Sequence, residues 1–354
     1  MKICIITYDE YLNIPYIKKY ENILRKYKID YDIIFWNRSN DKYEKELNHF
    51  IFNKTVSRSK WTKIIPFIQW RRYTLNIIKK NKYDKLIVLT TVPGVLINNY
   101  LTNHFNGKYL LDVRDFTYEN IYIYRKIIER LIMKSYITTL SSKGFYQWMN
   151  KNNKLVITHN ITNFENNYEY SPFFKKDVIT LAFVGGIRYY NENINIIKQL
   201  GSKDRFLLKY VGKIHPKCDL QPFCDKNGIL NVKFYPSYDN SQKPQIYKDV
   251  DLINAVYGNK TLEVTTALPN KLYDCILYRK PIIVSKKTYL AEVVNKYNIG
   301  LTIDIESESL ENAINDYIFN FKEKEFLNGC EKLLSVVMLE ENKAIRNIEE
   351  FINK

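Results

Sequence analysis

Short apolar runs that alternate with helical stretches constrain the fold of this 354-residue chain more than any other feature. Such runs between helical stretches are typical of a parallel sheet, which helices cover on both faces. The first half therefore predicts a doubly wound α/β domain, a Rossmann-like unit. Its expected strands are residues 2–7, 31–36, 84–90, 108–113, 135–141 and 154–158.

The same pattern restarts near residue 178 and predicts a second Rossmann-like unit, so the fold class is α/β with two parallel sheets. A chain of this length is too long for one ordinary core. Ligands of open α/β sheets bind beyond the carboxyl ends of the strands, so two facing units would place a site in the cleft between them. The second series of expected strands is 178–184, 206–211, 231–235, 250–254, 281–284 and 300–303.

The domain boundaries follow from these two series of strands. We expect an N-terminal domain at 1–165, a polar and aromatic linker at 166–177 and a C-terminal domain at 178–335. The tail at 336–354 is helical in pattern and can pack on either domain, including a return to the first.

Positive charge is concentrated in the first domain. The whole chain has a net charge of +16, and residues 1–165 carry 28 Lys and Arg against 14 Asp and Glu. Residues 166–354 are almost neutral, with 26 against 24. This asymmetry indicates an anionic partner for the first domain: a membrane surface, a phosphorylated acceptor or a nucleic acid.

Several classes of protein are disfavoured by what the sequence lacks. The start of the chain does not have the order of a secretory signal peptide, and no apolar run approaches the roughly 20 residues of a membrane-spanning helix. The five cysteines are odd in number and widely spaced, which predicts neither a disulfide framework nor a zinc site. We therefore expect a cytoplasmic protein without a zinc site. No other cofactor is expected.

A glycine turn follows the first expected strand of the second domain. Gly185 and Gly186 precede Ile187 and Arg188, at the point where a strand is expected to give way to a helix. Glycines let the backbone approach a phosphate closely, and helix N-termini favour anions. Arg188 would add a fixed positive charge. An ordinary strand-ending turn explains the same residues equally well.

A second motif begins with Pro269-Asn270-Lys271-Leu272 and continues through Asp274 to the expected strand at 281–284. Lys271 near a helix start would pair with a phosphate, and Asp274, one turn later, would accept hydrogen bonds from ribose hydroxyls. A helix start with a favourable capping charge is the competing interpretation.

The segment PNKLYDCILYRKPIIVS, with Glu292-Val293-Val294 and Asn298-Ile299-Gly300 after it, resembles the donor site of family-4 glycosyltransferases. The resemblance is nearest to bacterial members that build capsule and other surface polysaccharides. It implies the GT-B architecture, retention of anomeric configuration and independence from metals. It is specific over about residues 181–304 and moderately so around 109–116.

The resemblance assigns residues of the second domain to a nucleotide-sugar, with a UDP-linked sugar expected. Two departures from the family pattern matter. The first of two glutamates that the family usually has falls on Thr266, and the second falls on the shorter Asp274. No lysine follows the glycine turn between Tyr189 and Asn195, and Lys213 would supply the missing charge. The expected donor-binding residues are Gly185, Gly186, Arg188, Lys213, Asn270, Lys271, Leu272 and Asp274.

A run of acidic and basic residues ends the fourth expected strand of the first domain, where Asp112, Arg114 and Asp115 follow one another closely. Similar D-x-R-D runs occur in polysaccharide glycosyltransferases of this type. Asp115, with Arg114, is the candidate for activating or positioning the acceptor. An ion cluster that ties the loop down is an alternative of nearly equal weight.

A basic and aromatic stretch lies between Glu46 and Asp84, where there is no acidic residue. Tryptophans suit a lipid–water interface, and basic residues near an anionic bilayer contribute about 1 kcal/mol each. The stretch predicts a peripheral membrane or acceptor patch, with a solvated helix as the competing interpretation. Its expected members are Arg58, Lys60, Trp61, Lys63, Trp70, Arg71 and Arg72.

Together these features predict a glycosyltransferase that moves a sugar from a nucleotide donor to a lipid-linked or saccharide acceptor, at the inner face of the cell membrane. Nucleic-acid binding by the basic domain is an alternative, although no nucleic-acid module is recognisable and none is expected as a partner. A sugar-nucleotide epimerase and an inactive glycosyltransferase homologue are further alternatives.

Overall fold

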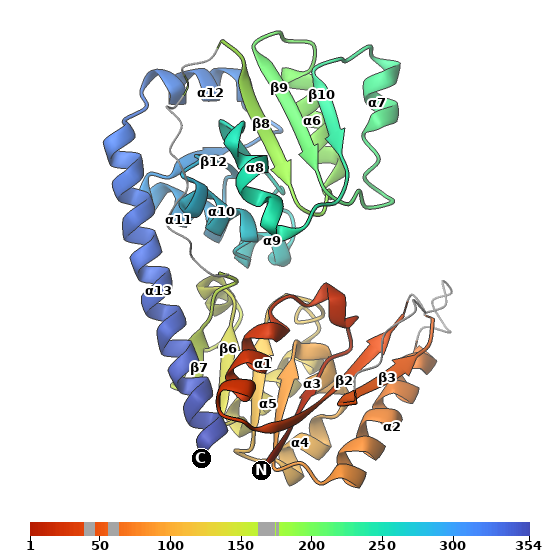
Figure 1. The fold of residues 1–354 in the computed structure, drawn as a ribbon. Coiled ribbons are helices and arrows are strands. Elements are labelled where there is room, and N and C mark those ends of the chain that lie inside the picture. Colours follow the sequence, from red (N-terminus) through yellow and green to blue (C-terminus); the bar gives the residue numbers. More distant parts are fainter. Residues whose placement is uncertain (39–46, 56–63, 162–173, 175–176) are drawn as a thin grey trace. The chain divides into compact units, whose positions relative to one another are not determined.

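The computed structural model describes residues 1–38, 47–55, 64–161, 174 and 177–354 (Figure 1). It divides the chain into two compact units. Unit 1 comprises Met1–His159 together with Leu339–Lys354, and unit 2 comprises Asn160–Met338. Most of the linker expected at 166–177 lies outside the described residues, so its structure stays a prediction.

Unit 1 contains a seven-stranded parallel sheet in the order β3-β2-β1-β4-β5-β6-β7, within the described residues. Its central strands carry aliphatic residues on both faces, as a sheet covered by helices on both sides requires. The strands are β1 (Lys2–Ile6), β2 (Asp30–Asn37), β3 (His49–Asn53), β4 (Lys85–Leu89), β5 (Tyr109–Val113), β6 (Ile137–Leu140) and β7 (Leu155–Ile157).

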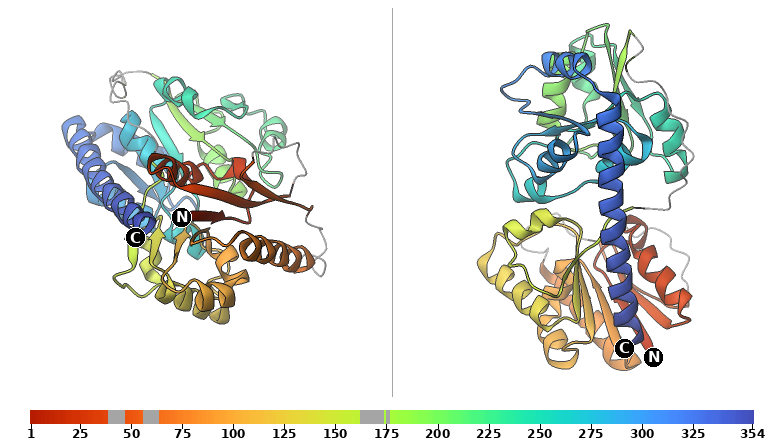
Figure 2. Two further views of the ribbon diagram at one scale, coloured as in Figure 1. Left: turned by 60° about the horizontal axis from the view of Figure 1, so that its bottom comes forward. Right: turned by 90° about the vertical axis from the view of Figure 1, so that its left-hand side faces the viewer.

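Two groups of helices cover the faces of this sheet. One face packs against α2, α3, α4 and α5, and the other packs against α1 and the last turns of α13 (Figure 2). The helices are η1 (Tyr11–Asn13), α1 (Ile17–Lys26), α2 (Ile64–Asn81), α3 (Thr91–Leu96), α4 (Asn98–His104), α5 (Tyr122–Lys134) and η2 (Lys143–Gln147).

Unit 2 contains a six-stranded parallel sheet in the order β10-β9-β8-β11-β12-β13, again within the described residues. One face packs against α6, α7 and α12, and the other against α8, α10, α11 and the start of α13. The strands are β8 (Ile179–Val184), β9 (Phe206–Val211), β10 (Val232–Tyr235), β11 (Leu252–Ala255), β12 (Ile282–Ser285) and β13 (Gly300–Ile303). The helices are α6 (Tyr190–Leu200), α7 (Gln221–Lys226), η3 (Asn240–Gln242), α8 (Lys243–Lys248), α9 (Leu262–Thr266), α10 (Asn270–Tyr278), α11 (Tyr289–Tyr297), α12 (Leu310–Phe319) and α13 (Glu323–Asn353).

The expected fold class is confirmed, because both units are parallel α/β sheets with helices on both faces. One strand was missing from the expectation. Residues His49–Asn53 form β3 at the edge of the first sheet, paired with β2. Three of its five residues are only partly buried, so the continuous apolar pattern of a central strand is absent.

The last helix, α13, contributes side chains to both units. Its first half places Phe326, Cys330, Leu333 and Val337 in a hydrophobic core of unit 2. Its second half places Ala344, Ile348, Phe351 and Ile352 in a hydrophobic core of unit 1. The spacing of three and four residues is that of a single buried stripe along one helix. Glu341 lies on this stripe, between the two apolar groups.

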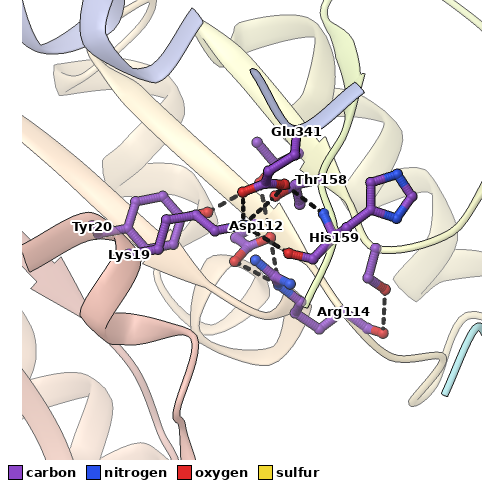
Figure 3. A network of polar contacts seen from close by, with 9 residues as sticks. Lys19, Tyr20, Asp112, Arg114, Thr158, His159 and Glu341 are labelled. Atoms are coloured by element: carbon purple, nitrogen blue, oxygen red, sulfur yellow. Dashed lines mark hydrogen bonds and ion pairs between the residues drawn. The ribbon is translucent and has the colours of Figure 1, made fainter. Parts of the chain in front are cut away.

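Glu341 forms part of a polar network within unit 1 (Figure 3). The carboxylate is 5% exposed and forms an ion pair with Lys19. Its Oε2 atom accepts hydrogen bonds from the backbone N–H of His159 at 2.7 Å and from the Thr158 hydroxyl at 3.0 Å. Neighbouring Glu340 pairs with Lys143 and with the His159 ring, whose Nε2 lies 3.0 Å from its Oε2 atom. The carboxylates therefore fasten the middle of α13 to the carboxyl end of β7.

We predict that Glu341→Gln lowers the free energy of unfolding by about 3 kcal/mol, because it leaves the Lys19 ammonium, whose side chain is only 14% exposed, without its counter-charge. Glu349→Gln is the matched control on the same helix. Glu349 pairs with Lys26, whose side chain is 63% exposed, so this loss is expected to stay within about 0.5 kcal/mol. Urea unfolding of both variants measures the difference, and equal losses would show that the Glu341 network does not fasten the helix.

We also predict that acid destabilises the wild type more steeply than Glu341→Gln. Burial alone would raise the pKa of Glu341, but the Lys19 charge and the hydrogen bonds from His159 and Thr158 lower this pKa below its usual value. A depressed pKa stabilises the folded state above the unfolded value of about 4.3, and this contribution is lost as the pH falls below it. Melting temperatures between pH 7 and pH 3 should therefore converge for the two proteins at the acid end.

Candidate functional site

Each sheet reverses its strand order at one point, and the loops that leave the strands there flank a natural ligand position. In unit 2 the reversal lies between β8 and β11. The loop after β8 contains the glycine turn, and the loop after β11 leads through α9 to α10. Two of the motifs that the sequence singled out therefore lie at the same edge of the same sheet.

The glycine turn packs closely against the loop that follows β9. Gly185 and Gly212 have φ angles of +120° and +134°, which favour glycine. A side chain on Gly212 would come within 2.2 Å of the Gly185 carbonyl oxygen, so only glycine allows this approach. The Ile187 N–H donates to the Lys213 carbonyl at 2.9 Å, and the side chains of Arg188 and Lys213 are both exposed. The turn and the loop after β9 thus each present one cation to solvent from a fixed backbone.

Asn193 on α6 holds the turn in place, a feature that the sequence analysis did not identify. Its fully buried amide Nδ2 donates to the carbonyl oxygens of Arg188 at 2.6 Å and Tyr189 at 2.9 Å. Its Oδ1 accepts from Asn254 at the end of β11 at 3.4 Å. The turn after β8 is therefore connected to the strand across the reversal point.

Lys271 lies in the first turn of α10 but is buried. Its ammonium lies 3.0 Å from the centre of the Phe183 ring and donates to the Tyr257 hydroxyl at 3.0 Å. Burial lowers the pKa of Lys271 well below its usual value, and the charge of Lys243 lowers it further, against the opposite effect of Asp274. Tyr257 in turn stacks on Tyr189 at 4.7 Å. Lys271 thus lies beneath an aromatic layer, where burial opposes its positive charge.

The other two residues expected on α10 differ from each other. Asn270 is exposed at the first position of the helix. Leu272 is 1% exposed and belongs to the hydrophobic core of unit 2, where its side chain anchors the helix. Any contribution of Leu272 to ligand binding would come from its backbone at the positive end of the helix dipole.

Asp274 is engaged by residues of α8 that the sequence analysis did not connect with it. Its Oδ1 accepts from the Lys243 ammonium at 2.8 Å, and its Oδ2 accepts from the Tyr247 hydroxyl at 2.9 Å. Burial, and to a lesser extent the charge of the Asp274 carboxylate, raises the pKa of Tyr238 to about 12. Thr266, at the place of the family's first glutamate, is fully buried and donates to the Leu262 carbonyl at 2.6 Å.

In unit 1 the two residues expected to act on the acceptor differ in burial: Arg114 is buried and Asp115 is exposed. The Arg114 guanidinium donates from Nε to both oxygens of Asp112, at 2.9 and 3.0 Å, and lies 4.4 Å from the centre of the Tyr16 ring. Asp115 is exposed at the carboxyl edge. Sequence reasoning missed Asp9, after β1, whose pKa is raised by burial and by the charge of Asp115. Asp9 also pairs with Arg38 at 3.7 Å.

The burial of one of its two tryptophans corrects the prediction of the basic patch. Trp70 is fully buried in the core between the sheet and α2, so it cannot face a membrane. Arg71 and Arg72 are exposed on α2, and Arg71 Nε donates to the Leu96 carbonyl at 2.8 Å. The remaining members, Arg58, Lys60, Trp61 and Lys63, lie outside the described residues.

Large apolar side chains are exposed beside the remaining cations. On α2 these are three isoleucines, and a second group surrounds the start of α5 near Arg125 and Lys126. Both helices lie on the same face of the first sheet. The exposed fractions are 61% for Ile64, 52% for Ile65, 49% for Ile68, 47% for Tyr118, 51% for Ile121, 66% for Tyr122 and 71% for Ile123.

Within the described part of the chain, no helix has both the length and the apolar composition needed to cross a bilayer. Among the same residues, no three or more His, Cys, Asp or Glu side chains are grouped so that they could hold a metal ion. All five cysteines are buried thiols.

Comparison with known proteins identifies the fold. No protein-family model matches the chain, and no curated protein matches its sequence. Among solved structures, sucrose-phosphate synthase from Thermosynechococcus elongatus matches with a TM-score of 0.73 and 13% identity, over 98% of this chain and 99% of the other. HepE from Anabaena, in complex with UDP and glucose, gives 0.71 and 13% over 99% and 100%. The lipopolysaccharide outer core galactosyltransferase WaaB gives 0.65 and 16% over 99% of both chains. The chain therefore has the two-domain Rossmann-like fold of the GT-B glycosyltransferases.

Proposed function

We propose that this protein is a glycosyltransferase that binds a UDP-sugar at the carboxyl edge of the sheet in unit 2. The observation that carries the proposal is the convergence of Arg188, Lys271 and Lys243 around the reversal point of this sheet. Lys271 donates to the Tyr257 hydroxyl at 3.0 Å, and Tyr257 stacks at 4.7 Å on Tyr189, the residue after Arg188. Lys243 donates at 2.8 Å to Asp274, which lies on α10 one turn after Lys271. The three cations therefore belong to one electrostatic cluster, which suits the diphosphate of a nucleotide.

The backbone of the site supports the same ligand. The turn after β8 places the half-buried Gly185 and the exposed Gly186 beside Arg188, and the first turn of α10 directs the positive end of its dipole to the same edge. A phosphate bound there would meet main-chain N–H groups without interference from side chains. HepE, which has the same fold, was solved with UDP and with UDP-glucose, which favours UDP as the nucleotide.

The acceptor is assigned to unit 1, where Asp115 would orient or deprotonate its hydroxyl group. Asp115 is exposed at the carboxyl edge, and its charge acts on Asp9. Arg114, in contrast, would act only by holding the loop, because its guanidinium is buried against Asp112. The reaction would retain the anomeric configuration and need no metal, with a lipid-linked or saccharide acceptor in surface polysaccharide synthesis.

A peripheral position on an anionic membrane is proposed for unit 1. The exposed isoleucines of α2 stand beside Arg71 and Arg72, and those around the start of α5 stand beside Arg125 and Lys126. Apolar side chains that enter the headgroup region, with cations around them, are the elements of an interfacial membrane patch. A cytoplasmic enzyme held in this way would meet a lipid-linked acceptor in the plane of the bilayer.

We predict that UDP raises the melting temperature of the protein and that Arg188→Ala weakens UDP binding about 10- to 100-fold. Loss of one charge-assisted contact costs about 1.5–3 kcal/mol, and about 1.4 kcal/mol corresponds to a tenfold change. A thermal-shift screen with UDP, GDP, CMP and ADP, followed by titration calorimetry, measures both effects. Arg205→Ala is the control, because Arg205 is exposed and directly precedes β9, at the amino edge of the same sheet.

The screen also tests the proposal as a whole. No shift with any nucleotide would contradict a donor site and favour an inactive or nucleic-acid-binding protein. If UDP binds, incubation with a UDP-sugar alone distinguishes transfer from epimerisation, since an epimerase converts the donor without an acceptor. Nuclear magnetic resonance of a transferred sugar reports the anomeric configuration, and inversion would exclude the retaining reaction.

We predict that replacing Ile65, Ile68, Ile121 and Ile123 with serine reduces sedimentation with anionic phospholipid vesicles at least tenfold. Burial of an isoleucine side chain contributes about 1.5–3 kcal/mol, and serine removes most of that surface. UDP binding should remain as in the wild type. The control is Leu230→Ser with Phe319→Ser, which replaces side chains of unit 2 that are 81% and 89% exposed. Equal loss in both variants would contradict a membrane patch on unit 1.

A further inference from the structure

We propose that Lys243 is a nucleotide-binding residue and that Asp274 acts through it as a positioning residue, without contacting the ribose itself. The proposal deepens the function proposed above and rests on it. It departs from the expectation drawn from the sequence, in which Asp274 accepts hydrogen bonds from ribose hydroxyls.

Both oxygens of the Asp274 carboxylate are already engaged within unit 2. Oδ1 accepts from Lys243 at 2.8 Å and Oδ2 accepts from Tyr247 at 2.9 Å. Tyr247 is 1% exposed and stacks on Tyr278 of α10 at 4.6 Å, so its hydroxyl is held in place. An aspartate side chain is one methylene shorter than a glutamate, which keeps this carboxylate close to the helix axis and within reach of α8.

Lys243 is the more accessible member of the pair. Its side chain is 16% exposed, against 7% for Asp274. It starts α8 directly after a turn that a capping box between Asp239 and Gln242 fixes. An ammonium group has three N–H donors, and Asp274 takes one of them. A ligand that approaches this part of the edge therefore meets a positioned donor before it meets the carboxylate.

The charges favour an anion at this position. Lys243 and Lys271 repel each other, since the charge of Lys243 lowers the pKa of Lys271. A bound diphosphate relieves this repulsion, while Asp274 holds the Lys243 ammonium in place before the ligand arrives and so lowers the entropic cost of binding. Lys243 would thus supply the cation that the segment from Tyr189 to Asn195 lacks after the glycine turn.

A double-mutant cycle tests both parts of the proposal. The UDP affinities of the wild type, Lys243→Met, Asp274→Asn and the double variant are measured by calorimetry, with the unfolding temperature of each protein without ligand. We expect Lys243→Met to weaken UDP binding at least tenfold and Lys243→Arg to restore most of the loss. Asp274→Asn should also weaken binding, but should add less than twofold when Lys243 is already methionine. Lys248→Met, an exposed change on the same helix, should bind like the wild type.

The outcomes distinguish a failure of the proposed function from a failure of the roles proposed for Lys243 and Asp274. If the wild type binds no nucleoside diphosphate, the proposed function fails and this proposal fails with it. If the wild type binds UDP and Lys243→Met binds equally well, the role of Lys243 fails while the function stands. If Lys243→Met only lowers the unfolding temperature, its role is structural and the proposal is overturned. If Asp274→Asn costs as much in the double variant as alone, Asp274 contacts the nucleotide itself and the positioning role is wrong.

Discussion

The buried stripe of α13 is the interaction on which both units depend. A doubly wound sheet needs helices on both faces, and each of the two sheets obtains part of one face from this 31-residue helix. Glu341 lies on the stripe where one apolar group ends and the next begins. A carboxylate there would be costly without partners, and Lys19, Thr158 and His159 provide them. The network thus gives the helix one definite register on unit 1.

The candidate donor site follows from a second constraint, the direction of the strands. Because all strands of a parallel sheet end at one edge, residues from β8, β9, β11 and α10 meet there although they are far apart in the chain. The polar core behind the edge then determines which groups reach it. Asn193 holds the turn that carries Arg188, and Asp274 holds Lys243. The positions of the cations are therefore set by uncharged or oppositely charged side chains that the solvent does not reach.

The sequence predicted the central strands well because a strand buried on both faces is a continuous apolar run, as in Ile3–Ile6. It did not reveal β3, whose partly buried residues at the sheet edge have no such pattern. It predicted roles for Arg188 from the glycine turn before it and for Asp274 from its place one helical turn after Lys271. It did not reveal the Lys243–Asp274 pair, since 31 residues separate the two and only the packing of α8 on α10 joins them. Trp70 shows the opposite error, because composition alone does not distinguish a buried face from an exposed one.

Unit 1 is built from both ends of this sequence, and this determines the order in which the two units complete their folding during synthesis. Residues 339–354 complete one of its cores, yet they are the last of these 354 residues to be translated. Domains generally fold as units, the N-terminal one first as the chain emerges. Here the N-terminal sheet has one face incompletely covered, and Lys19 without Glu341, until unit 2 has been made. The unit that begins first therefore finishes last, and a nascent chain halted at residue 338 would expose apolar surface that chaperones recognise.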